Sequence, residues 1–281
     1  MQLIARERTL SLSVPRIMGI LNLTPDSFSD GGKYQHLAAA IDHAAAMLDA
    51  GAAIIDIGGE STRPGAETVS AEEEAARVVP VVVALAQRFD TFISVDTSKA
   101  LVMRESAAAG THLINDVRSL SEPGALAAAA ASQLPVCLMH MQGDPSTMQQ
   151  APYYENVLAE VEAYFVRQIE RCEAAGIAKN RLLLDPGFGF GKTLEHNYQL
   201  LARLGDFHHL GLPLLVGMSR KSMIGQLLDL PPEKRVTGSV ACAVIAALQG
   251  AQIIRVHDVR QTVEAMRVVE ATLSAKETYF Q

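Results

Sequence analysis

Polar and charged side chains recur along the chain at or directly after the ends of short apolar runs. These side chains are Asn22, Glu60, Asp96, Asn115, His140, Asp185, Ser219, Lys221, Arg255 and His257. In parallel α/β folds the carboxyl ends of the strands meet at one edge, and ligands bind there. Residues with purely structural roles would be scattered instead. The pattern therefore predicts one site assembled from many strand ends.

A first group of residues near these ends is cationic or can become so. The group consists of Arg63, Arg220, Lys221, Arg255 and His257. The whole chain is acidic, with 24 Lys and Arg against 31 Asp and Glu and a net charge of −7, so no global basic surface for nucleic acid exists. One such cation alone would most simply form a surface salt bridge. Several of them after three different strands indicate an anionic ligand with phosphate or carboxylate groups.

A second group consists of Asp96, Asn115 and Asp185. Carboxylates and an amide inside a barrel mouth are costly unless they are paired or used. They suit a flat heterocycle that presents adjacent N–H and NH₂ donors. The alternative is helix capping or turn formation, because Asp96 precedes Thr97 and Asp185 precedes Pro186. For Asp185 the spacing agrees equally with both interpretations.

Other catalytic signatures are missing from the sequence, which has no Gly-x-Ser-x-Gly turn, no HExxH metal pair and no CxxC pair. Its three cysteines lie among apolar neighbours, as is typical of reduced core thiols. The segment 187–193 ends like a phosphate-binding P-loop, but Pro186 stands where that motif needs its first glycine. We interpret its glycines as allowing Phe188 or Phe190 to approach a ring closely.

Eight short apolar runs alternate with helical patterns and would position these residues. The runs cover 17–21, 53–58, 92–95, 112–114, 136–139, 182–184, 214–217 and 253–256. The helical patterns cover 37–50, 72–88, 99–109, 124–132, 155–175, 196–204, 238–249 and 259–275. Several end at a glycine, the usual helix stop. Eight regular units predict a single (β/α)₈ TIM barrel over about residues 16–275, rather than an open doubly wound sheet.

We expect residues 1–281 to form one domain, with residues 1–16 as a hairpin-like segment that plugs the barrel floor. The longest apolar stretch, around 240–248, is far shorter than the roughly 20 residues that a membrane span needs. The first eight residues lack the apolar core of a signal peptide. We therefore expect a cytoplasmic protein without a membrane partner.

Several segments resemble, in order, the motifs of the dihydropteroate synthase family. The two long segments are GILNLTPDSFSDGG at 19–32 and DIGGESTRPG at 56–65. The shorter ones are SVDT at 94–97, IND at 114–116, LMHM at 138–141, DPGFGFGK at 185–192, GMSRKS at 217–222 and RVHD at 255–258. The resemblance spans about residues 15–275 and is closest to the bacterial, single-domain enzymes.

This resemblance implies a pterin-binding (β/α)₈ barrel that acts as a transferase in folate biosynthesis. The enzyme would condense 6-hydroxymethyl-7,8-dihydropterin pyrophosphate with p-aminobenzoate by a dissociative, SN1-like displacement, giving 7,8-dihydropteroate and pyrophosphate. The family also implies Mg²⁺ as a cofactor, a homodimer, and inhibition by sulfonamides, which mimic p-aminobenzoate.

The resemblance further implies a role for each matching residue. Those expected to bind the pterin are Asp96, Asn115, Asp185, Lys221, Met139, Val117, Phe190 and Gly217. Those expected to bind the pyrophosphate are Asn22, Thr62, Arg63, Arg255 and His257, with Asn22 as the Mg²⁺ ligand. Those expected to bind p-aminobenzoate are Thr62, Arg63, Pro64, Ser219, Lys221, Phe28 and Phe190. Those expected to act in catalysis are Arg63, Lys221, Asp96 and Asp30.

Three alternatives stay open on the sequence. A pterin-barrel methyltransferase that uses methyltetrahydrofolate and a corrinoid would lack the anion-binding features at 62–64 and 219–221. A non-catalytic pterin-binding protein would be expected to lose Asn22, Arg63, Lys221 or His257, and all four are present. An aldolase would need a Schiff-base lysine at a strand end or a metal site of several histidines, and the position of Lys221 is compatible with the former role.

Overall fold

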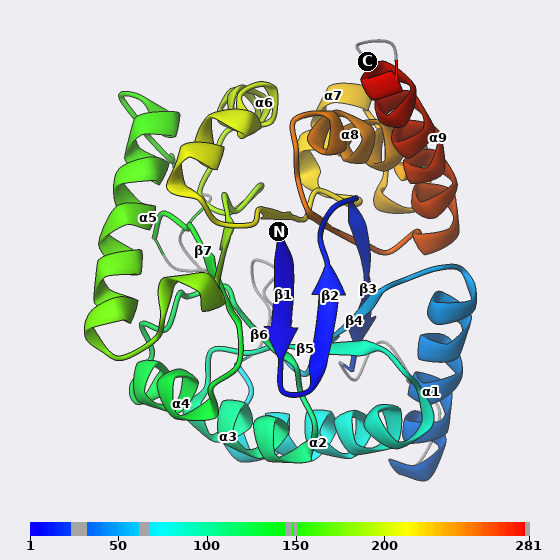
Figure 1. Ribbon diagram of the computed structural model, residues 1–281, viewed down its shortest axis with the longest axis vertical. Coiled ribbons are helices and arrows are strands. Elements are labelled where there is room, and N and C mark those ends of the chain that lie inside the picture. The colour runs from blue at the N-terminus through cyan, green and yellow to red at the C-terminus, as the bar shows by residue number, and fades with distance from the viewer. Residues whose placement is uncertain (24–32, 62–67, 144–147, 149–150, 279–281) are drawn as a thin grey trace.

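The computed structural model describes residues 1–23, 33–61, 68–143, 148 and 151–278. This described part contains an eight-stranded parallel sheet (Figure 1). The strands are β3 (Arg16–Asn22), β4 (Ile54–Gly58), β5 (Phe92–Asp96), β6 (Leu113–Asp116), β7 (Val136–Met139), β8 (Leu182–Asp185), β9 (Leu215–Val216) and β10 (Ile253–Val256). They pair in the order β8-β7-β6-β5-β4-β3-β10-β9, and a bridge between Leu184 and Leu214 joins the two edges. The predicted (β/α)₈ barrel is confirmed.

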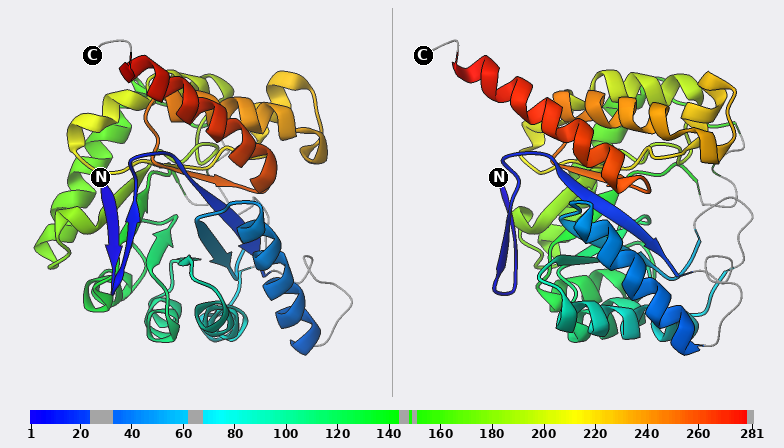
Figure 2. Two further views of the ribbon diagram at one scale, coloured as in Figure 1. Left: turned by 45° about the vertical axis from the view of Figure 1, so that its right-hand side comes forward. Right: turned by 90° about the vertical axis from the view of Figure 1, so that its right-hand side faces the viewer.

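Helices surround the barrel (Figures 1 and 2). They are α1 (Lys33–Asp49), α2 (Ala71–Arg88), α3 (Ala100–Ala109), α4 (Ala125–Ser132), α5 (Val157–Ala174), α6 (Leu194–Ala202), α7 (Ser222–Leu228), α8 (Val236–Leu248) and α9 (Val259–Thr278), with short 3₁₀ helices at Lys179–Arg181, Leu204–Leu210 and Pro232–Lys234. Each predicted helix is present, whereas α7 was not predicted because two turns are too short to show a period. No helix in the described residues is long and apolar enough to cross a membrane.

The N-terminal segment forms the expected hairpin. Strands β1 (Gln2–Ala5) and β2 (Arg8–Ser11) pair antiparallel, and Leu3, Ala5 and Leu12 are buried. Their side chains join one apolar cluster with residues from all eight barrel strands: Met18, Ile54, Phe92, Leu113, Cys137, Leu183, Leu215 and Ile253. Figure 2 shows the hairpin across one end of the barrel, with β3 pointing away from it. The hairpin therefore closes the floor, as predicted.

The side chains inside the barrel change from apolar to largely polar two residues beyond this floor. Strand side chains alternate between faces, so the residues two positions further along each strand also point inward. These residues are Ile20, Asp56, Ser94, Asn115, Met139, Asp185, Gly217 and Arg255. The side chains between them, such as Ile55 and Ile93, belong to the separate core under the helices. One pleat thus separates an apolar floor from a polar layer.

Candidate active site

The polar layer centres on Arg255 of β10. Its Nε donates to Oδ2 of Asp56 at 2.6 Å, and its Nη2 donates to Oδ2 of Asp96 at 2.9 Å. Asn115 donates from Nδ2 to the same oxygen of Asp56 at 3.2 Å. Asp56 is fully buried and Asn115 is nearly so. Side chains from β4, β5, β6 and β10 therefore form one network, in which a single guanidinium balances two carboxylates.

Burial perturbs the protonation of this network. It raises the pKa of Asp96 to about 7; the charge of Arg255 opposes this shift and that of Asp56 adds to it. Burial also disfavours the charged form of Arg255, but the nearby carboxylates of Asp56 and Asp96 outweigh that effect and raise its pKa. Arg255 therefore stays cationic, while Asp96 exchanges its proton near neutral pH. Perturbed carboxylates of this kind are typical of functional sites.

Asp185 and Lys221 are a second set of opposite charges in the same interior, and they interact electrostatically. Burial raises the pKa of Asp185, and the charge of Lys221 opposes that shift most strongly. Burial lowers the pKa of Lys221 to about 8, and Asp185 opposes that shift in turn. The Nζ of Lys221 donates to the carbonyl oxygen of Phe188 at 2.6 Å and lies 4.6 Å from the centroid of the Phe190 ring. Each charge thus stabilises the other.

An apolar surface lies within the site. Val117, Met139 and Phe190 are buried together with Met148 in a cluster separate from the main core. Phe188, by contrast, packs into the core under the helices. Of the two phenylalanines considered for a ring contact, only Phe190 is therefore placed to make it. Apolar faces beside a few fixed polar groups are the usual composition of a pocket for a flat heterocycle.

The ends of β9 and β10 are tied together. Ser219 accepts at Oγ from the backbone N–H of His257 at 3.1 Å and lies 3.0 Å from its Nδ1. Arg220 was expected among the anion-binding cations, but its Nε and Nη2 donate to both carboxylate oxygens of Asp258, at 2.9 and 2.5 Å. Through this bidentate pair, the guanidinium of Arg220 holds the loop after β9 against the loop after β10. Gly217 lies beside Arg255, since a Cβ there would be 3.7 Å from the Cβ of Arg255.

Asn22, at the end of β3, is the predicted metal ligand. A Cβ on Gly58 would lie 3.6 Å from its Oδ1 and 3.7 Å from the Cβ of Asp96, because the strand register places Asn22 and Asp96 on either side of Gly58. Oxygen donors of this kind are the ligands that Mg²⁺ prefers. No group of three or more His, Cys, Asp or Glu that could hold a metal occurs among the described residues. The donor set fits a Mg²⁺ ion that takes most of its ligands from phosphate and water.

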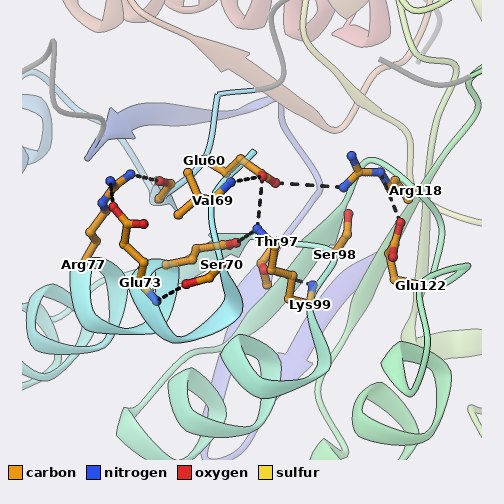
Figure 3. Close-up of polar contacts among 12 residues, drawn as sticks. Glu60, Val69, Ser70, Glu73, Arg77, Thr97, Ser98, Lys99, Arg118 and Glu122 are labelled. Atoms are coloured by element: carbon orange, nitrogen blue, oxygen red, sulfur yellow. Dashed lines mark hydrogen bonds and ion pairs between the residues drawn. The ribbon is translucent and has the colours of Figure 1, made fainter. Parts of the chain in front are cut away.

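Glu60, two residues after the end of β4, contacts three residues from other segments. Its Oε1 accepts from the backbone N–H of Val69 at 3.1 Å and lies 3.1 Å from Nζ of Lys99, while its Oε2 lies 3.9 Å from Nη1 of Arg118 (Figure 3). Lys99 also donates to Oε2 of Glu74 at 2.6 Å, and Glu74 is 1% exposed. The ends of β4, β5 and β6 are thereby connected through one acidic side chain and two cations.

Five predicted site residues lie outside the described residues: Phe28, Asp30, Thr62, Arg63 and Pro64. Three of these follow Glu60 within four positions. Because Glu60 also binds Val69, it connects the two flanks of segment 62–67.

Two buried groups of the site were not predicted. Asp56 interrupts an apolar run and lies two residues after Ile54, which belongs to the floor. A lone carboxylate inside an apolar strand is costly to bury, and this signal could have identified it. Lys192 ends the glycine-rich segment and is 3% exposed, with its Nζ 2.9 Å from Nδ1 of His140. For Lys192 the sequence gave only a weak signal of a buried role, because its segment does not match the phosphate-binding motif.

Comparisons with known proteins agree with this geometry. A family model described as "Pterin binding enzyme" matches residues 18–257. The dihydropteroate synthase of Escherichia coli strain K12 is 70% identical over 277 residues, which cover 99% of this chain and 98% of that protein. The Yersinia pestis dihydropteroate synthase, solved as a sulfonamide drug complex, superposes with a TM-score of 0.94 at 70% identity, covering 98% of this chain and all of that one. The Xanthomonas albilineans enzyme, solved with 4-aminobenzoic acid, gives 0.91 at 50% identity, with 97% and 98% covered.

Proposed function

The chain belongs to the dihydropteroate synthase family of pterin-binding enzymes, and from this premise we propose how its residues share the family's reaction. It is a transferase of folate biosynthesis that joins 6-hydroxymethyl-7,8-dihydropterin pyrophosphate to p-aminobenzoate and forms 7,8-dihydropteroate and pyrophosphate. A pterin-barrel methyltransferase is not favoured, because a relative that matches almost the whole chain is a dihydropteroate synthase.

The pterin ring would lie in the polar layer of the barrel. The observation that carries this assignment is the buried network in which Asp96 and Asn115 approach Arg255 and Asp56. Asp185 would accept from the pterin N3–H and 2-amino group, and Lys221 would donate to ring acceptors. The faces of the ring would contact Val117, Met139 and Phe190, with Gly217 leaving room beside Arg255.

The pyrophosphate would lie above the pterin at the barrel mouth. Thr62, Arg63, Arg255 and His257 would bind its oxygens. Asn22 would offer its amide oxygen to Mg²⁺, and the neighbouring Asp96 carboxylate supports an oxygen-rich environment there. When bound, the metal neutralises negative charge on the phosphates.

The p-aminobenzoate would occupy the outer part of the site. Its contacts would come from Thr62, Arg63, Pro64, Ser219, Lys221, Phe28 and Phe190. We expect sulfonamides to compete for this position, in keeping with the drug complex of the Yersinia pestis relative. Undiminished product formation at millimolar sulfonamide would contradict this assignment.

The displacement would be dissociative. Arg63, Arg255 and His257 would stabilise the charge of the leaving pyrophosphate. Asp96, with Asp30, would place negative potential near the cationic methylene carbon, and Lys221 would hold the ring in line. An arylamine is unprotonated at neutral pH, so p-aminobenzoate attacks without a strong base. The main contribution of the protein would be positioning and electrostatics.

Pyrophosphate release tests this proposal. The assay contains Mg²⁺, the pterin pyrophosphate and p-aminobenzoate, each omitted in turn, and dihydropteroate is measured in parallel. Release that requires all three components supports the scheme. The variant Arg63→Ala should lose turnover sharply; activity within a few-fold of the parent would remove Arg63 from this role.

We also propose that residues 1–281 form one barrel domain and that the protein is a cytoplasmic homodimer. All three cysteines are free and buried, as is usual in a reducing compartment. Leu228, Ile245 and Leu248 on α7 and α8 are exposed apolar side chains that a second copy could cover. Sedimentation of the parent and of Leu248→Glu tests the dimer, since loss of the dimer in the variant alone would place its interface here.

A further inference from the structure

Lys192 carries a buried ammonium group that the scheme above does not use. Its Nζ lies 2.9 Å from Nδ1 of His140 and donates to three carbonyl oxygens, those of Gly187 at 2.9 Å, Phe190 at 3.1 Å and His140 at 3.3 Å. The residue is 3% exposed. An ammonium ion has three protons, so four acceptors at this range saturate it. Its position is therefore set by the two loops that surround it.

These two loops follow β7 and β8 and are in direct contact. A Cβ on Gly187 would lie 1.9 Å from the carbonyl oxygen of His140, so only glycine is tolerated at that contact. We call this contact between the two loops the seam. Lys192 lies at the seam and donates hydrogen bonds to the carbonyl oxygens of both His140 and Gly187. Burial and the charge of Lys192 lower the pKa of His140 to about 2, so its imidazole is neutral and can accept at Nδ1.

The same seam supports two residues assigned to the pterin. The backbone N–H of His140 donates to the carbonyl oxygen of Asp185 at 2.9 Å, and the N–H of Gly187 donates to Oδ1 of Asp185 at 2.8 Å. Phe190, whose carbonyl oxygen Lys192 binds, supplies the ring of the apolar cluster. A displacement of this loop would therefore move both the carboxylate and the aromatic ring.

We propose that Lys192 is a positioning residue for the pterin, and that its ammonium ion holds the loop after β8 against His140 and thereby sets the Asp185 carboxylate and the Phe190 ring. The inference rests on the assignment of Asp185 and Phe190 to the pterin under the proposed function.

The charge of Lys192 also acts on Asp185. Burial raises the pKa of Asp185, and Lys221, the Gly187 N–H, Lys192 and Arg255 all oppose that rise. Burial lowers the pKa of Lys192 itself to about 7, with Asp185 opposing the shift and Lys221 adding to it. Without Lys192 the pKa of Asp185 should rise further. Asp185 must be ionised to accept from the pterin. As the pH is lowered, kcat/KM for the pterin pyrophosphate should therefore begin to fall at a higher pH than in the parent.

The test compares Lys192→Met with Lys192→Gln and Tyr154→Phe. Tyr154 donates to the Gly191 carbonyl oxygen at 2.7 Å, so its variant loosens the same loop without removing a charge near Asp185. For Lys192→Met we expect about a tenfold rise in the KM for the pterin pyrophosphate, with the KM for p-aminobenzoate within about twofold. The acid limb of kcat/KM for the pterin should move up by about half a pH unit or more. Tyr154→Phe should leave that limb in place.

Lys192→Gln keeps two hydrogen-bond donors between the two loops but carries no charge. It should therefore shift the acid limb as much as Lys192→Met, and it replaces that variant in the test if Lys192→Met does not fold. The phosphate groups of the substrate titrate identically with every variant, so their effect cancels when the pH profiles of variant and parent are compared. An unmoved acid limb in the folded charge-free variants, or an equal rise in both KM values, would overturn the proposal. If the parent releases no pyrophosphate, the reaction scheme fails; calorimetric titration of the pterin pyrophosphate across pH then still decides the role of Lys192.

Discussion

Arg255 donates from Nη2 to Oδ2 of Asp96 across 2.9 Å, so a side chain expected to bind pyrophosphate is paired with one expected to bind the pterin. Its Nε is engaged with Asp56 at 2.6 Å. Under the proposed function, Arg255 would therefore link the two parts of the first substrate electrostatically. It balances the carboxylates of Asp56 and Asp96.

Replacing Arg255 should therefore affect both subsites. We expect Arg255→Met to lower kcat/KM by about 10²–10³-fold, because a preorganised charge at the leaving group is lost and the carboxylates of Asp56 and Asp96 lose their cation. Steady-state kinetics measures this. The control is Arg203→Met, an arginine that is 62% exposed and pairs with Asp206, and its activity should be unchanged. A variant at Arg255 within fivefold of the parent would contradict the assignment.

Asp56 should contribute through its charge, since its Oδ2 accepts from both Arg255 and Asn115 and its Oδ1 has no hydrogen-bond partner among the described residues. Asp56→Asn keeps the shape, and its amide oxygen can still accept from both donors, but the negative charge beside Arg255 is lost. We expect about a tenfold loss in kcat/KM for the pterin pyrophosphate. Combined with Arg255→Met, the effect should be strongly non-additive, as measured by a double-mutant cycle. Independent, additive losses would show that the two residues do not act together.

The pH dependence of kcat/KM should be bell-shaped. The acid limb should report Asp96 and Asp185 together, because burial raises the pKa of Asp96 to about 7 and also raises that of Asp185, so activity should fall as these carboxylates are protonated with decreasing pH. The pKa of Lys221 is lowered to about 8, so its ammonium is lost as the pH rises through that value. The limbs report the free enzyme as coupled, macroscopic values. A profile that stays flat from pH 6 to 9 would refute the need for both charged forms.

Lys99 should be important for stability, because it neutralises Glu60 and the buried Glu74. We expect Lys99→Met to lower the free energy of unfolding by about 3 kcal/mol, since two acidic groups lose their cation. Urea unfolding measures the loss. The double variant Lys99→Met with Glu74→Gln should recover a large part of it, because no charge then remains buried at that position. No recovery in the double variant would locate the cost elsewhere, such as in lost packing of the lysine stem.

The local sequence determined the eight strands, the glycine-terminated helices and the set of strand-end residues. It could do so because these features depend on near neighbours: a short apolar run, a helix period and a residue that tolerates positive φ. Gly51, Gly110, Gly176 and Gly250, at the predicted stops, all have φ between 87° and 125°. The hairpin at the floor was likewise readable from the alternation of apolar and polar residues in its short strands.

The tertiary structure decided which of the polar residues meet and what charge each one faces. The sequence grouped Arg220 with the anion-binding cations, but closure of the barrel brings Asp258 into bidentate contact with it. It left Asp56 and Lys192 without a role, although one lies in the central network and the other at the seam of two loops. Contacts between residues up to 199 positions apart set these partners. Their protonation follows from burial and from those partners, and neither is encoded in any short segment of the chain.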